Sequence, residues 1–190
     1  MVEYLEDAVY IEKVREGNRE AFRELVHRYH GLVYHIAYSM CGNAETSRDA
    51  VQEVFLRAYR KIDTYQPQWS FKTWIRRITV NYLLDQRKKR KLETVSLVNE
   101  EGESIEVGDS TYDPVDSHME TEREQLVFQA VLQLPEPYQT IIVLRHFEDM
   151  SYEEIAHTMD IPIGTVMTQL HRARKKLMEA LRPLQSELMF

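Results

Sequence analysis

Four hydrogen-bonding side chains recur at helical spacing near the C-terminus of the chain: Thr168, His171, Arg172 and Lys175. At roughly 100° per residue they fall on one face of a helix, and no acidic residue joins them before Glu179. A face made of donors suits phosphates and base edges. Any surface helix has a polar back, so DNA contact depends on the elements that present this face.

Those elements have the pattern of a helix-turn-helix. Ser151 and Glu154 form a capping box that begins a short helix. Pro162 ends it, because proline cannot continue a helix and disfavours helix in the residue before it. A second helix is then expected over 163–181, with one apolar stripe made of Val166, Leu170, Ala173, Leu177 and Leu181. A short helix, a tight turn and one-sided basic charge together favour DNA contact.

A second basic helix is expected from Phe71 to about Arg90, with a core face of Phe71, Ile75, Ile78 and Tyr82. Trp74 lies at the edge of that face, which favours packing. The rest of the helix is basic: Lys72, Arg76, Arg77, Arg87, Lys88, Lys89, Arg90 and Lys91. A loop with Tyr65 and Trp69 leads into it, and aromatic rings beside cations suit single-stranded nucleic acid. The alternative for 87–91 is a solvated helix end.

The helix expected over 44–62 has an apolar residue on its outer face. Its core stripe is Val51, Val54, Phe55, Ala58, Tyr59 and Ile62. The opposite face carries Asp49, Gln52, Glu53, Leu56 and Arg60. An exposed leucine alone is commonplace, but a leucine inside a polar rim resembles the centre of an interface. Both interpretations stay open from the pattern alone.

The pattern is helical elsewhere, and it indicates an all-α fold in two small domains. A helix or the end of one is expected over 10–18, one or two helices over 19–40, and a loop over 64–70. The domains are residues 1–92 and 118–190, the second being the helix-turn-helix, joined by a flexible acidic linker over 93–117.

Charge is distributed unevenly along the chain, whose net charge is −7. Residues 1–92 hold 17 basic and 12 acidic residues, residues 93–126 hold one and 11, and residues 127–190 hold 6 and 8. The acidic block is either a solvated spacer or a mimic of nucleic acid that occupies a partner's basic channel. The asymmetry therefore says more about partners than the total does.

Several classes of protein are disfavoured. No apolar run approaches the ~20 residues of a membrane span, so no membrane insertion is expected. The one cysteine, Cys41, excludes an internal disulfide and favours a structural thiol in a reducing compartment, and we expect a cytoplasmic protein. Seven histidines lack the carboxylate or cysteine spacing of a metal site or a metalloenzyme. We expect no metal, no cofactor and no catalytic residue.

Three blocks in order resemble bacterial sigma factors. They are DAVQEVFLRAY at 49–59, FKTWIRRITVN at 71–81 followed by Asp85 and Arg87, and SYEEIA at 151–156 followed by GTV at 164–166 and HRAR at 171–174. The resemblance runs from about Glu12 to Leu181. Since extra domains are absent, the chain is similar to the extracytoplasmic-function (ECF) group.

The resemblance implies a bipartite promoter reader. The face with Asp49, Gln52, Glu53, Leu56 and Arg60 would dock on the coiled-coil clamp helices of the largest subunit of core RNA polymerase. Minus-ten DNA would be bound and melted by Tyr65, Trp69, Ser70, Lys72, Arg76, Arg77, Asn81, Arg87 and Lys88, with Asn81 as the base-contacting amide. The minus-thirty-five element would be read by Thr165, Thr168, Gln169, His171, Arg172, Lys175 and Lys176.

Further partners follow from the resemblance alone. The linker would thread toward the polymerase active site and RNA exit channel, and an anti-sigma factor is implied. Gln139 and Gln169 stand where the family often has arginine. Gln169 lies off the centre of the DNA face, so a phosphate or packing role is affected. The alternative function is a helix-turn-helix regulator that acts as a dimer without polymerase, which predicts a palindromic site.

Overall fold

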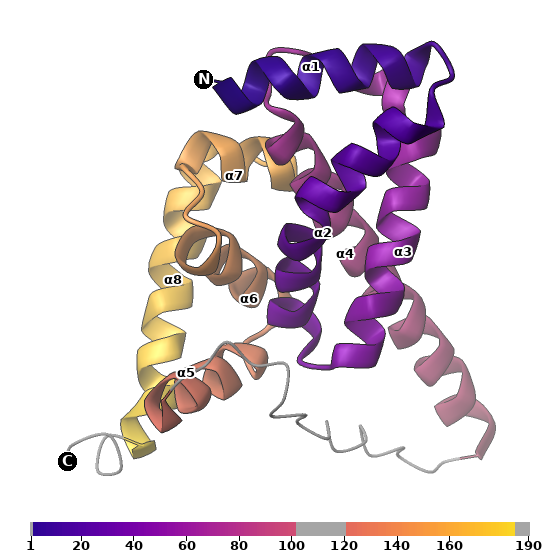
Figure 1. The fold of residues 1–190 in the computed structure, drawn as a ribbon. Helices are drawn as coiled ribbons and strands as arrows, with labels where there is room; N and C mark the ends of the chain where they lie inside the picture. The colour runs from indigo at the N-terminus through magenta and orange to yellow at the C-terminus, as the bar shows by residue number, and fades with distance from the viewer. Residues whose placement is uncertain (1, 102–120, 185–190) are drawn as a thin grey trace.

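The computed structural model describes residues 2–101 and 121–184, which form helices and short turns with no strand (Figure 1). The N-terminal unit holds α1 (Val2–Arg15), α2 (Arg19–Cys41), α3 (Ala44–Arg60), the 3-10 turn η1 (Ile62–Thr64) and α4 (Phe71–Glu101). The C-terminal unit holds α5 (Glu122–Leu132), α6 (Glu136–Ile142), a π-helical turn (Val143–Phe147), α7 (Tyr152–Met159), α8 (Ile163–Leu181) and a 3-10 turn (Arg182–Leu184). The all-α expectation is confirmed.

Local capping sets the helix ends of the helix-turn-helix. The Ser151 hydroxyl accepts from the Glu154 amide at 3.2 Å, and the Glu154 carboxylate accepts from the Ser151 amide at 2.9 Å. Asp160 ends α7 in the left-handed conformation at φ 56°. Pro162 precedes α8, which spans the expected 163–181. The capping box and both helices are therefore confirmed.

The N-terminal unit packs around the apolar faces of α2, α3 and α4. Leu25, Val33, Val54, Phe71 and Ile75 are fully buried there, as their helical spacing predicts. The spacing fails at one core position: Tyr59, assigned to the core stripe of α3, is 37% exposed.

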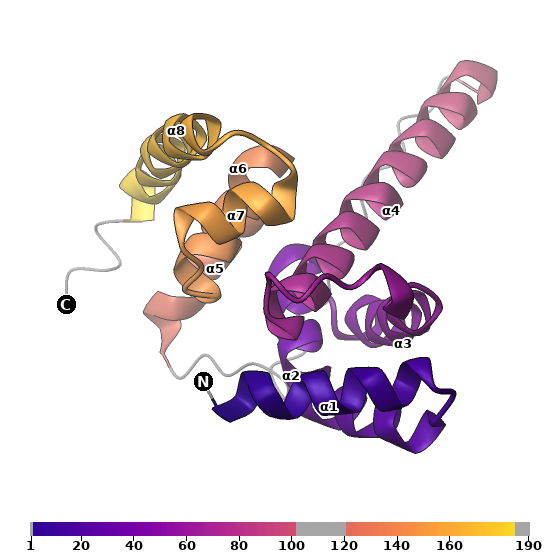
Figure 2. The same ribbon diagram turned by 90° about the horizontal axis from the view of Figure 1, so that it is seen from above.

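Helix α4 is longer than expected, because it continues to Glu101 instead of ending near Arg90. Its second half projects beyond the other helices in both views (Figures 1 and 2). Residues 93–101 are thus helical where the sequence indicated the start of a flexible linker. The rest of that linker, residues 102–117, lies outside the described residues.

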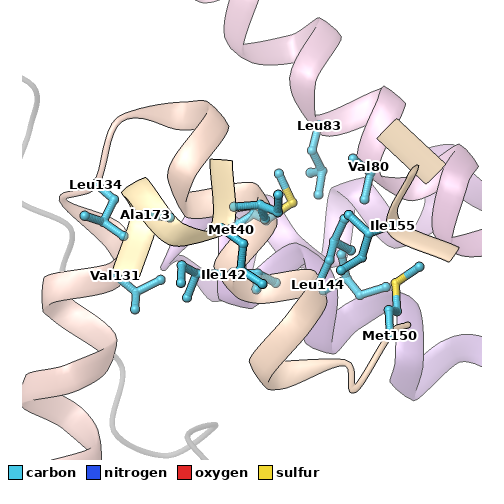
Figure 3. Packing of buried hydrophobic residues seen from close by; sticks show 14 of the residues in the cluster. Met40, Val80, Leu83, Val131, Leu134, Ile142, Leu144, Met150, Ile155 and Ala173 are labelled. Atoms are coloured by element: carbon cyan, nitrogen blue, oxygen red, sulfur yellow. The ribbon is translucent and has the colours of Figure 1, made fainter. Parts of the chain in front are cut away.

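The two units pack against each other through a large apolar cluster (Figure 3) and a smaller one made of Tyr38, Ala44 and Phe128. Met40 of α2 and Val80 and Leu83 of α4 meet residues of the C-terminal unit, among them Leu144 and Ile155. A polar contact supports the cluster: the amide of buried Gln139 donates to the Met40 carbonyl at 3.0 Å. Gln139 is therefore part of the contact between the units.

Gly42 provides a test of this packing. It adopts φ +68° at the end of α2, and a Cβ there would lie 2.6 Å from Cδ1 of Leu132 in α5. We expect Gly42→Ala to lower the free energy of unfolding by about 1–2 kcal/mol, because an L side chain is strained in the left-handed region. Urea titration followed by circular dichroism measures this.

The matched control is Gly31→Ala, in the middle of α2, where an added Cβ meets no atom within 4 Å. Alanine stabilises a helix interior relative to glycine by about 1 kcal/mol. Equal effects of the two substitutions would contradict the assignment of strain to Gly42.

Candidate nucleic-acid interface and docking face

Helix α8 presents the donor face that the sequence indicated. Thr168, His171, Arg172 and Lys175 are exposed, while Val166, Leu170 and Ala173 on the opposite face are buried. In both views α8 lies on the side of the C-terminal unit away from α2 and α3 (Figures 1 and 2). The arrangement leaves His171, Arg172 and Lys175 open to a ligand, whereas the Thr168 hydroxyl donates to the Gly164 carbonyl at 2.9 Å.

The flanks of α8 are less uniform. Lys176 is exposed and Thr165 half-buried. Gln169 is half-buried and its sheltered Oε1 has no hydrogen-bond partner. The opposite flank holds Met167, which is 56% exposed, and Arg174, whose Nε lies 3.4 Å from Nε2 of His146. Neither was among the expected site residues, although the helical angle alone places both beside the donor face.

A second set of side chains gathers around the first turns of α4. The Ser70 hydroxyl accepts from the Thr73 amide at 3.1 Å and so caps the helix. Trp69, Arg77 and Asn81 line one cavity of about 340 Å³. The remaining lining residues are Lys61, Thr64, Gln66, Trp74, Ile78 and His157. The cavity combines aromatic surfaces, amides and cations, which are the groups that hold an unstacked base.

Three residues expected in this set are not free to bind a strand in this arrangement. Tyr65 is buried; its ring packs edge-on against Trp74, and its hydroxyl donates to the Trp69 carbonyl at 2.9 Å. Tyr65 is thus a support of the loop, not an exposed stacking surface. Arg76 is also buried, and the half-buried Arg87 donates to the Met40 carbonyl. Lys72 and Lys88 are exposed as expected.

The C-terminal unit contributes directly to the electrostatics here. Burial, reinforced by nearby Arg77, lowers the pKa of His157, against a smaller opposing effect of Asp160. Burial would raise the pKa of Glu154, but hydrogen bonds from Ser151 and Thr73 outweigh it and lower that pKa. At neutral pH the site therefore faces a neutral imidazole and an ionised carboxylate.

The outer face of α3 is exposed as expected at Asp49, Gln52, Leu56 and Arg60. Leu56 is 51% exposed. Half-buried Glu53 pairs with Arg57, with Oε1 and Nε 3.0 Å apart. The sequence did not identify the rest of the apolar patch. Leu56 shares a shallow pocket of about 460 Å³ with Arg19, Phe22, Gln52, Phe55 and Tyr59.

Among the described residues, the cysteine, the candidate metal ligands and the apolar helices point to no further site. Burial raises the pKa of the half-buried Cys41 thiol, although Arg87 and Arg90 oppose the effect, which fits a structural thiol. Within 2–101 and 121–184, no group of three or more His, Cys, Asp or Glu side chains could hold a metal ion. No helix in that part of the chain is both long and apolar enough to cross a membrane.

Two family models match the chain in the order of its units. Sigma-70 region 2 matches residues 25–93, and Sigma-70, region 4 matches residues 124–177. The first range covers most of α2, α3 and the first part of α4, and the second runs from α5 into α8.

Relatives match over nearly the whole chain. The ECF RNA polymerase sigma factor SigW of Bacillus subtilis is 34% identical, over 92% of this chain and 96% of that protein. The ECF RNA polymerase sigma-E factor of Haemophilus influenzae is 36% identical, over 97% of this chain and 100% of that protein.

Solved structures share the fold. The sigma factor RpoE of Bartonella quintana, in complex with the anti-sigma factor NepR, superposes with a TM-score of 0.65 at 24% identity, over 85% of this chain and 96% of that one. CnrH in complex with the cytosolic domain of CnrY gives 0.66 at 23% identity, over 94% and 98%. With both family models in order and relatives above 30% identity along its length, the chain belongs to the ECF family of RNA polymerase sigma factors.

Proposed function

We propose that the chain binds core RNA polymerase through α3 and directs it to bipartite promoters. The observation that carries this proposal is the apolar patch of exposed Leu56 and Tyr59 beside half-buried Phe22, rimmed by Asp49, Gln52 and Arg60. An apolar centre inside a polar rim is the anatomy of a protein interface. The clamp helices of the polymerase's largest subunit are the partner we propose.

The cavity at the start of α4 is the proposed minus-ten site. Trp69 offers a face for stacking, and the amide of Asn81 can both donate to and accept from a base edge. Extruding a base costs a few kcal/mol, which such contacts offset. Ser70, Lys72, Arg77 and Lys88 would contact the backbone of the melted strand. Arg76 joins them only when its present partner moves.

Helix α8 is the proposed reader of the minus-thirty-five element. Its first turns, with Thr165 and Thr168, would enter the major groove, and Arg172 suits the acceptor edge of guanine. His171, Lys175 and Lys176 would contact base edges or phosphates. Gln169, with its sheltered amide, is assigned to packing beside the groove.

The remaining roles are those of an accessory initiation factor in the cytoplasm. The chain supplies no catalytic group; the polymerase performs the chemistry, and no cofactor is needed. The acidic segment over 93–117 would thread into the polymerase as a nucleic-acid mimic. An anti-sigma factor is the proposed inhibitor, and the RpoE of Bartonella quintana is itself bound to the anti-sigma factor NepR in its solved structure.

Transcription with purified components tests the proposal as a whole. Core polymerase plus this chain should produce transcripts that share two sequence elements upstream of their starts, as read by sequencing the RNA. Free chain should bind the same promoter duplex weakly in a gel shift. Tight, specific binding by the chain alone would instead establish the dimeric regulator.

The docking face has its own test in Leu56→Glu. A charge at the centre of the apolar patch should weaken association with core polymerase at least tenfold, because the carboxylate loses its hydration in the interface. Fluorescence anisotropy of labelled chain titrated with core polymerase measures the change.

Val9→Glu, the same change at a 54% exposed position of α1, is the matched control and should bind like wild type. Equal core binding by Leu56→Glu and wild type would show that the docking face lies elsewhere.

Arg172→Ala tests α8. We expect lower transcription from the cognate promoter, corresponding to roughly 1–3 kcal/mol if the guanidinium contacts a base. Abortive initiation by reconstituted holoenzyme gives the rate. Arg123→Ala removes the same charge from an exposed position of α5 and should leave the rate unchanged. Wild-type transcription by Arg172→Ala would mean that another face of α8 meets DNA.

A further inference from the structure

The C-terminal unit places acidic groups on two arginines of the proposed minus-ten site and on Thr73, whose hydroxyl lies 3.0 Å from that of Ser70. Nη2 of Arg76 donates to the Glu148 carbonyl at 2.8 Å and lies 3.2 Å from its carboxylate. Nη2 of Arg77 lies 3.8 Å from the carboxylate of Asp160. The Thr73 hydroxyl donates to the Glu154 carboxylate at 3.2 Å. Three carboxylates of one unit thus occupy partners that a phosphate backbone would use.

An aromatic contact completes the resemblance to a nucleic acid. The imidazole of His157 stacks on the indole of Trp69, with 4.3 Å between centroids and 14° between planes. His157 also forms part of the wall of the cavity that contains Asn81. A flat nitrogen heterocycle therefore lies where a base would stack.

We propose that α7, with the turn before it and Asp160 after it, mimics single-stranded DNA and occupies the minus-ten site of the same chain. The carboxylates of Glu148, Glu154 and Asp160 stand in for phosphates, and the ring of His157 stands in for a base. The free chain is then closed to the strand until the two units separate. The inference rests on the proposed minus-ten role of α4 and deepens it with an internal competitor.

The contacts between the two units differ in burial, and the buried ones contribute most to holding the closed arrangement. Asp160 has an 88% exposed side chain, so its pairing with Arg77 is screened and weak. Glu148 and Arg76 are each 6% exposed, and Nδ1 of His35 in α2 lies 2.7 Å from the same carboxylate. A buried ion pair with a third polar neighbour is specific to one arrangement, because separation leaves its charges without partners until water or DNA replaces them.

Binding of a single strand tests the mimicry. The probe is a fluorescein-labelled pool of 15-nucleotide single-stranded DNA of random sequence, titrated with full-length chain and followed by anisotropy. Wild type should bind weakly. His157→Ala, which vacates the face of Trp69, and Glu148→Gln, which removes the buried carboxylate charge, should each bind at least fivefold more tightly. Wild-type affinity in both would overturn the proposal.

Glu153→Gln is the matched control, because Glu153 is an exposed acid of α7, five residues after Glu148. It changes the net charge as Glu148→Gln does, and its affinity should stay within twofold of wild type. An equal gain in Glu153→Gln and Glu148→Gln would reduce the effect to general charge and overturn the mimicry.

The natural thiol reports closure separately from DNA. Cys41 lines a cavity whose walls include Leu132 and Gln129 of α5 as well as residues of α2, α3 and α4. Iodoacetamide should therefore modify Cys41 faster in His157→Ala than in wild type or Glu153→Gln, under conditions where circular dichroism shows the same helix content. Since His157 lies at the surface of the contact, this variant remains informative if Glu148→Gln fails to fold.

Arg77→Ala distinguishes a failure of the proposed minus-ten surface from a failure of the proposed internal competitor. In the His157→Ala background it should reverse the gain in strand affinity. If the gain persists without Arg77, the proposed minus-ten surface is wrong. If Arg77→Ala weakens strand binding by wild type while His157→Ala and Glu148→Gln change nothing, the minus-ten surface stands and the internal competitor is wrong.

Discussion

The buried pairing of Arg76 with Glu148 is the constraint on which the arrangement of the molecule depends. A guanidinium removed from water needs a partner, and Arg76 finds its carboxylate 72 residues away in the other unit. The apolar cluster that includes Met40, Leu144 and Ile155 also joins the two units, but apolar contact is not directional. The ion pair, together with the hydrogen bond from Gln139, selects one orientation of the C-terminal unit.

This orientation separates the surfaces of the chain into covered and open ones. The start of α4 lies under α7, whereas the donor face of α8 and the patch around Leu56 remain exposed. The open surfaces are the ones assigned to duplex DNA and to the polymerase, and the covered one is assigned to the melted strand. A melted strand exists only after the polymerase has bound. Covering its site until then therefore blocks no earlier step of initiation.

Local chemistry explains what the sequence could predict. The bounds of α8 and the capping box of Ser151 with Glu154 depend on neighbours a few residues away, and both were predicted correctly. The burial of Arg76 and the packing between units depend on contacts far apart in sequence, which no helical period encodes. Tyr65 was misjudged because an aromatic residue in a polar loop looks exposed until its neighbours in space are known. Helix α4 overran its expected end because no proline or glycine stops it before Gly102.

Opening must draw its free energy from partners that bind the separated units better than the closed chain. The Leu56 patch lies away from the contact between the units and is available in both the closed and the separated state. Docking at that patch alone therefore does not shift the equilibrium between the two states. The shift has to come from contacts that require separation, which are the minus-ten strand at α4 and a polymerase surface that holds the C-terminal unit at a distance. Binding of α8 to the minus-thirty-five element, at a fixed spacing from the minus-ten element, also holds the C-terminal unit at a distance and so favours separation. In this account the promoter itself, as well as the polymerase, helps to open the chain.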